Sequence, residues 1–206
     1  MPPPDDAAPA HPWQPRPAEI AAEAARTEAE ARAARQRAEA RRWGGRIPSE
    51  RICSLPANAR ALARLDRDLI DALDASTPEQ QRDIARWAAR QACGLAGLDA
   101  FGVVAAALAA MDRGEPPPPP LGDTMRAWRH VSTDPHVPRT VVTTSDGTPN
   151  FSQQALALSA LRAAVREDPL VAAVDALHAA AYTHGQDWAR LVAQARATFA
   201  VLAGPT

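Results

Sequence analysis

The sequence predicts an all-α protein, a bundle of about six helices with a small β-hairpin or loop insert and an N-terminal arm. Apolar residues recur at three- and four-residue intervals through most of residues 47–203, which is the spacing of one face of a helix. All 23 basic residues are arginine, and both arginine and the abundant alanine are strong helix formers. Glycines and prolines divide the chain into segments of helical length.

The chain begins with a proline-rich stretch that we expect to be a disordered tail. Residues 1–17 contain seven prolines, each of which fixes φ and removes an amide donor. Residues 18–46 are instead rich in Ala, Glu and Arg and predict an exposed helical arm, which Gly44 and Gly45 end. Glutamates dominate the first half of this arm and arginines its second half, an order that complements the helix dipole.

Few large apolar side chains occur in this N-terminal part. They are Trp13, Ile20 and Trp43. Because alanine buries little area, we expect the first 46 residues to contribute almost nothing to the stability of the domain that follows.

Residues 47–206 predict the helical domain itself. One apolar stripe, at steps of three, four and four, indicates its first long helix and consists of Leu62, Leu65, Leu69 and Leu73. Thr77, Pro78 and Gln80 then form the signature of a capped helix start. A further helix is expected from about Asp99 until Gly114 and the prolines that follow it.

Residues 115–150 interrupt the helical pattern and predict a non-helical insert. Its five consecutive prolines favour a polyproline spacer, and Asp123 is a candidate cap for a short helix. Within 139–150, the β-branched run after Arg139 and the Asp146-Gly147 pair predict a small hairpin or an ordered loop.

Three amphipathic helices are expected to close the chain. Asn150 with Gln153 is the predicted cap of the first, Asp168 with Pro169 starts the second, and the third follows Gly185.

Composition excludes several functional classes. The net charge of −1 and the pI near 6.5 give no general attraction for nucleic acid or anionic lipid. Cys53 and Cys93 are isolated thiols, and Met1–Asp6 lacks the pattern of a signal peptide, so we expect a cytoplasmic protein. The absence of lysine and the wealth of alanine and proline indicate a very GC-rich genome, as in actinobacteria.

The run 92–111 is long enough to span a bilayer. It contains Asp99 at mid-segment, which insertion into lipid disfavours by about 3 kcal/mol. Two buried helices broken at Gly94 and Gly97 explain the run better, so no membrane association is expected.

We hypothesise that the protein is a non-enzymatic accessory or protein-interaction module of unknown partner. A long segment without helix signals inside a compact domain is often functional, and arginine with tryptophan is common at interfaces. The candidate binding residues lie in the insert: Arg126, Trp128, Arg129, His130, His136 and Arg139. The alternative interpretation is that Trp128 packs the insert onto the helices.

Two further functions remain as alternatives. A block of arginines on the arm could bind the phosphates of a nucleic acid, with Arg35, Arg37, Arg41 and Arg42 as candidates. An enzyme site on the insert could use His130, Asp134 and His136. The spacing of the histidines predicts no metal site, no motif indicates a cofactor, and no pattern of an activated serine or cysteine occurs.

Overall fold

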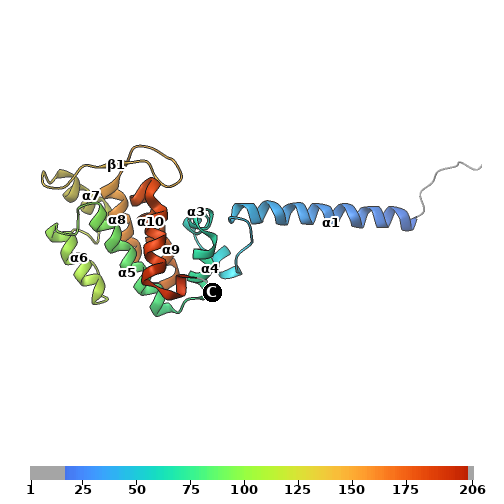
Figure 1. The fold of residues 1–206 in the computed structure, drawn as a ribbon, viewed down its shortest axis with the longest axis horizontal. Coiled ribbons are helices and arrows are strands. Elements are labelled where there is room, and N and C mark those ends of the chain that lie inside the picture. Colours follow the sequence, from blue (N-terminus) through green and yellow to red (C-terminus); the bar gives the residue numbers. More distant parts are fainter. Residues whose placement is uncertain (1–16, 204–206) are drawn as a thin grey trace, which may run out of the picture.

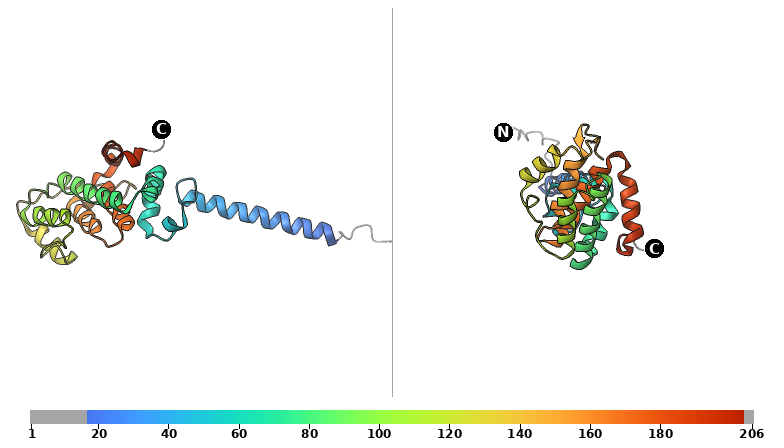
Figure 2. Two further views of the ribbon diagram at one scale, coloured as in Figure 1. Left: turned by 90° about the horizontal axis from the view of Figure 1, so that it is seen from below. Right: turned by 90° about the vertical axis from the view of Figure 1, so that its left-hand side faces the viewer.

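The computed structural model describes residues 17–203 and confirms the predicted all-α class with a small hairpin (Figure 1). A helical body carries the long helix α1 (Pro17–Arg42), which projects from one end of the body (Figure 1 and the left view of Figure 2). The body begins with three short helices, α2 (Glu50–Cys53), α3 (Ala57–Leu65) and α4 (Arg67–Ala75). The elements after them are α5 (Pro78–Leu95), α6 (Gly102–Asp112), α7 (Thr124–Thr133), β1 (Val141–Val142), β2 (Phe151–Ser152), α8 (Gln153–Ala164), α9 (Pro169–His184), η1 (Gly185–Asp187), α10 (Trp188–Thr198) and η2 (Ala200–Ala203).

The centre of the body is a three-helix packing of α5, α8 and α9. Pro78 and Asp168 illustrate why these helices begin where they do. Thr77 and Gln80 form a reciprocal capping box around Pro78, and the Asp168 carboxylate accepts hydrogen bonds from the amides of Leu170 and Val171. Both predicted helix starts are thus confirmed.

The predicted first long helix is two helices. The chain breaks between α3 and α4 at Asp66, whose carboxylate accepts a hydrogen bond from the Leu69 amide at 2.9 Å and caps α4. The apolar stripe survives the break, because Leu62, Leu69 and Leu73 are all fully buried. Asp66, which lies between the leucines of the stripe, is therefore the cap of a second helix, and the spacing of the leucines alone does not show this helix start.

The start of α8 also differs from the prediction. Ser152, not Asn150, is its cap, with the Ser152 hydroxyl accepting from the Ala155 amide. Asn150 lies just outside the helix with φ of 67°, a conformation that asparagine tolerates better than most residues.

The insert contains the short helix that Asp123 was expected to cap, so the segment 115–150 is non-helical only outside α7. Asp123 caps α7, a helix of ten residues, and the proline run before it ends in a turn over residues 119–122. After α7, Val141 pairs with Ser152 and Val142 with Phe151 in the predicted antiparallel hairpin. Asp146 stabilises the connecting loop by accepting hydrogen bonds from the Thr144 hydroxyl and the Thr148 amide.

The base of the arm is docked on the body, although a fully exposed arm was expected. Trp43 is only 2% exposed, its indole donates a hydrogen bond to Glu39 at 2.9 Å, and the Arg60 guanidinium lies 5.7 Å from its ring. The stretch 18–32 is exposed throughout. Sequence reasoning placed Trp43 outside the domain because two glycines follow it, but those glycines return the chain to α3.

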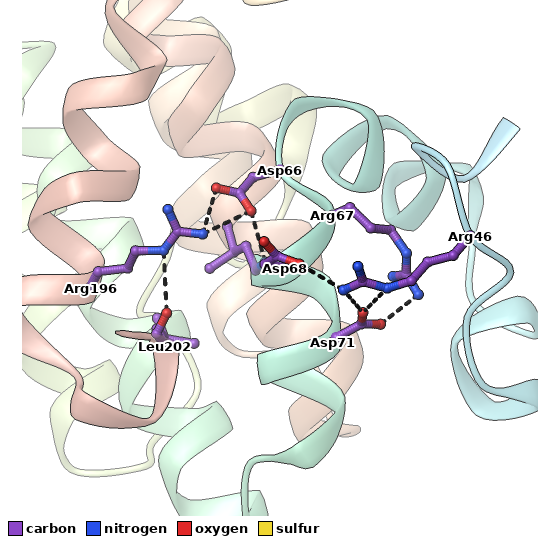
Figure 3. A network of polar contacts seen from close by, with 8 residues as sticks. Arg46, Asp66, Arg67, Asp68, Asp71, Arg196 and Leu202 are labelled. Atoms are coloured by element: carbon purple, nitrogen blue, oxygen red, sulfur yellow. Dashed lines mark hydrogen bonds and ion pairs between the residues drawn. The ribbon is translucent and has the colours of Figure 1, made fainter. Parts of the chain in front are cut away.

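A network of charged side chains fixes the segment after α1 (Figure 3). Arg46 donates to Asp68 at 2.7 Å and to Asp71, which also pairs with the buried Arg67. On the other side of α4, Arg196 of α10 binds the carboxylate of Asp66 and the carbonyl of Leu202. The segment after α1 and helix α10 are thereby both tied to α4.

Among residues 17–203, no helix combines the length and the apolar character needed to cross a membrane. The run 92–111 is divided between α5 and α6 by a turn, as expected for two helices.

Candidate interaction site on helices α7 and α8

The insert and α8 enclose an apolar pocket of about 270 Å³. Ala127 and Val131 turn the inner face of α7 toward the core, which leaves the neighbouring face of α7 over this hollow. The residues that line the pocket are Pro117, Leu121, Thr124, Met125, Ala127, Trp128, Ala155, Leu158, Ser159, Leu161 and Arg162.

Two large side chains of α7 give the pocket its character. Trp128 is partly buried: its side chain lines the pocket wall and is neither fully buried in the core nor fully exposed. Met125 is 67% exposed, the highest fraction among the large apolar side chains of the described residues. Leu158 and Leu161 face them from α8. The result is an apolar surface, open to solvent, with a flexible methionine at its edge.

The edge of this pocket carries positive charge. Arg162 of α8 closes one end and donates a hydrogen bond to the Thr124 hydroxyl at 2.5 Å. Arg129 is exposed and lies about 40° from Met125 around the helix, since each residue turns an α-helix by about 100°. The acidic residue Asp123 lies at the start of α7. The hydrogen bond from the backbone amide of Arg126 lowers the pKa of Asp123, so its carboxylate stays ionised and caps the helix.

The six predicted binding residues do not form one surface. Of the six, only Trp128 lines the pocket; Arg129 is exposed one turn after Met125, and Arg126 lies nearly opposite Trp128 on α7. His130 packs against Phe101, with ring centroids 5.8 Å apart. His136 and Arg139 are exposed in the segment that leads to β1.

The predicted enzyme residues likewise have different neighbours. Asp134 accepts a hydrogen bond from the backbone amide of His136, whereas His130 lies on Phe101. In the described part of the chain, no group of three or more His, Cys, Asp or Glu side chains could hold a metal ion. Cys93 is buried, and burial raises the pKa of its thiol to about 12, so it is not a nucleophile at neutral pH.

The arginines proposed for nucleic-acid binding are spread around α1. Arg35 and Arg42 lie on one side of the helix, and Arg37 and Arg41 on the other. Arg42 is moreover paired with Glu39 at 3.2 Å. This distribution gives no single basic face to follow a phosphate backbone.

Sequence reasoning missed a second, polar pocket on the other side of α8. It has a volume of about 600 Å³ and shares Ser159 and Arg162 with the apolar pocket. Its polar side chains come from α3, from α8 and the residues after it, and from α9, where Asp175, His178 and Tyr182 follow one another at steps of three and four. That spacing on an otherwise apolar helix was the signal available in the sequence.

The polar groups of this pocket are largely occupied with one another. The buried carboxylate of Asp175 accepts a hydrogen bond from the side-chain amide of Asn58 at 3.0 Å and forms an ion pair with Arg166. Tyr182 donates to Asp146 at 2.7 Å, and burial together with this bond raises the pKa of Tyr182 to about 12. His178 stacks on Tyr182 at 4.2 Å between ring centroids. An ion-paired carboxylate and a tyrosine held in its protonated form are structural groups rather than a general acid and base.

Two partly buried histidines should make the protein less stable in mild acid. Burial lowers the pKa of both His178 and His184 below 6.5, so the folded chain resists protonation while the unfolded chain does not. Below about pH 6.5 the unfolded state therefore binds more protons, and stability falls as the pH falls. The melting temperature of the wild type should drop between about pH 7 and pH 5, and by less in the double variant His178→Gln/His184→Gln. Equal drops in both proteins would contradict this assignment.

Comparison of the chain with models of protein families, with curated proteins and with solved structures finds no match.

Proposed function

We propose that this protein is a non-enzymatic interaction module that binds an acidic segment of another protein through the pocket between α7 and α8. The observation that carries the proposal is an open apolar pocket, with Met125 67% exposed at its edge and arginines beside it. An exposed apolar patch surrounded by polar residues is typical of an interaction site.

The chemistry of the pocket specifies the partner. Its walls accept one bulky apolar side chain, since methionine is flexible enough to fit such a group and tryptophan offers a large apolar face. Arg129 and Arg162 favour carboxylates next to that side chain. An amphipathic segment with leucine or phenylalanine among Glu and Asp satisfies both requirements.

The two unpaired cysteines, of which Cys53 is exposed, fit a protein that works in a reducing compartment, and we place it in the cytoplasm.

A labelled peptide of Glu, Ala and Leu tests the proposal by fluorescence anisotropy. It should bind the wild type, and Met125→Ala should weaken binding about tenfold, which corresponds to a loss of about 1.4 kcal/mol on truncation of this side chain. Because Met125 is exposed, this variant should keep the melting temperature of the wild type. Trp128→Ala and Arg129→Ala should weaken binding more than they lower the melting temperature.

Arg126→Ala is the matched control, because it removes an arginine from the same helix on the side away from the pocket. It should leave the affinity unchanged. The peptide with Lys in place of Glu should bind weakly. Equal affinity for both peptides, or no effect of Met125→Ala, would refute the proposed site.

A further inference from the structure

Helix α1 leaves most of its surface without a partner. It is 26 residues long, projects from the end of the body opposite α7, and carries Ile20 at 54% exposure (Figures 1 and 2). One face of it is free of charge along the stretch 20–38, where residues recur at steps of four, three, four, three and four. These residues are Ile20, Ala24, Thr27, Ala31, Ala34 and Ala38. Alternating steps of three and four are the spacing of the contact face of a coiled coil.

Charged residues border this face in two rows with a repeat of seven. One row is Glu23, Glu30 and Arg37, and the other is Glu28, Arg35 and Arg42. Each row changes from acidic to basic along the helix. These rows occupy the positions that face the partner helix across the edges of a coiled coil, so they decide which orientation is favourable.

We propose that α1 pairs with α1 of a second copy of this chain, in the antiparallel orientation. In the pairing that the charges favour, Ala31 lies against Ala34 of the second copy and Thr27 against Ala38. Glu30 then meets Arg37 and Glu28 meets Arg35, and the twofold symmetry repeats both contacts. Every one of these four contacts joins opposite charges.

The parallel orientation is unfavourable for the same residues. It would place Glu23 beside Glu28 and Arg37 beside Arg42 of the second copy, and only Glu30 with Arg35 would attract. Like charges at these positions destabilise the pair. Charge complementarity therefore selects both the occupant and its direction.

The base of the arm makes this pairing accessible. Trp43 and the contacts of Arg46 fix the end of α1 to the body, so α1 cannot fold back and cover its own free face. Alanines let the two helix backbones approach closely. Since they also bury little area, the pair should be weak, concentration-dependent and sensitive to salt.

Sedimentation of the full chain tests the pairing through charge reversal. The wild type should form dimers as its concentration rises. Glu28→Arg/Glu30→Arg should weaken the dimer about tenfold or more, because four exposed ion pairs become repulsive. Adding Arg35→Glu and Arg37→Glu to the same chain should restore the wild-type constant. Glu23→Arg is the matched control, because Glu23 has no charged counterpart in the proposed pairing.

Cysteine cross-linking distinguishes the two orientations, in a Cys53→Ser background that removes the exposed native thiol. A mixture of Thr27→Cys and Ala38→Cys chains should form a disulfide-linked dimer under mild oxidation. Each variant alone should not, because its two cysteines would be about 16 Å apart along the pair, beyond the reach of a disulfide. Cross-linking of each variant alone would show parallel helices and overturn the proposal. A monomer at every concentration, or no rescue by the compensating reversals, would overturn it as well.

Discussion

Trp43→Ala is expected to lower the free energy of unfolding by about 3–5 kcal/mol, the cost of replacing a buried aromatic residue with alanine. The side chain is 2% exposed, and its removal also breaks the hydrogen bond to Glu39 and the contact with Arg60. Urea denaturation followed by circular dichroism at 222 nm measures the effect. The loss should appear in the midpoint of the transition of the whole domain, because Trp43 belongs to the same buried cluster as the leucines of α3 and α4.

Ile20→Ala is the comparison for this experiment. Ile20 is exposed on the free part of α1, so its replacement should leave the midpoint unchanged when the protein is dilute. A chain that begins at Ile47 lacks the buried Trp43, so it should be less stable than the full chain. A Trp43→Ala variant with the stability of the wild type would show that the arm is not docked.

Gly44→Ala is expected to destabilise the protein by more than Gly45→Ala. Both glycines have positive φ, of 74° and 116°, so alanine is strained at either position. Only at Gly44 would the new Cβ also collide with the protein, because it would lie 2.3 Å from the carbonyl oxygen of Ala63. The added methyl group must therefore push the base of α1 away from α3.

Thermal unfolding of the two variants separates strain from collision. Backbone strain costs roughly 1–3 kcal/mol, and it is the whole effect expected for Gly45→Ala, since nothing lies within 4 Å of its Cβ position. Gly44→Ala should lower the melting temperature by several degrees more. Equal melting temperatures for both variants would show that α3 does not constrain the junction.

The sequence predicted those features that depend on near neighbours in the chain. The caps at Thr77 and Asp168 were recognisable because each cap and its helix start lie within a few residues. The hairpin around Asp146 was recognisable from turn chemistry for the same reason. Trp128 was named from the sequence as a candidate binding residue on a short helix, and it lies in the wall of the apolar pocket.

Features that depend on distant contacts could not be predicted. Trp43 was expected to be exposed because the residues that bury it lie in α3. The two glycines after Trp43 gave no indication that the chain folds back there. Asp175 forms its bond with Asn58, which is 117 residues away, and no local pattern indicates that contact. The division of the predicted site residues over several faces has the same cause. Spacing along an insert does not show which side of a helix its neighbours will cover.

The alanines of α9 have a consequence for how the protein responds to temperature. Ala172, Ala173, Ala176, Ala180 and Ala181 are all buried where α9 meets the other helices of the body. A core built on alanine exposes less hydrocarbon and proportionally more peptide group when it unfolds than a core of larger side chains. Since hydrocarbon raises the heat capacity of unfolding and peptide groups lower it, the heat capacity change should be small for a chain of this length. The curve of stability against temperature should therefore be shallow, with cold denaturation displaced far below the freezing point of water.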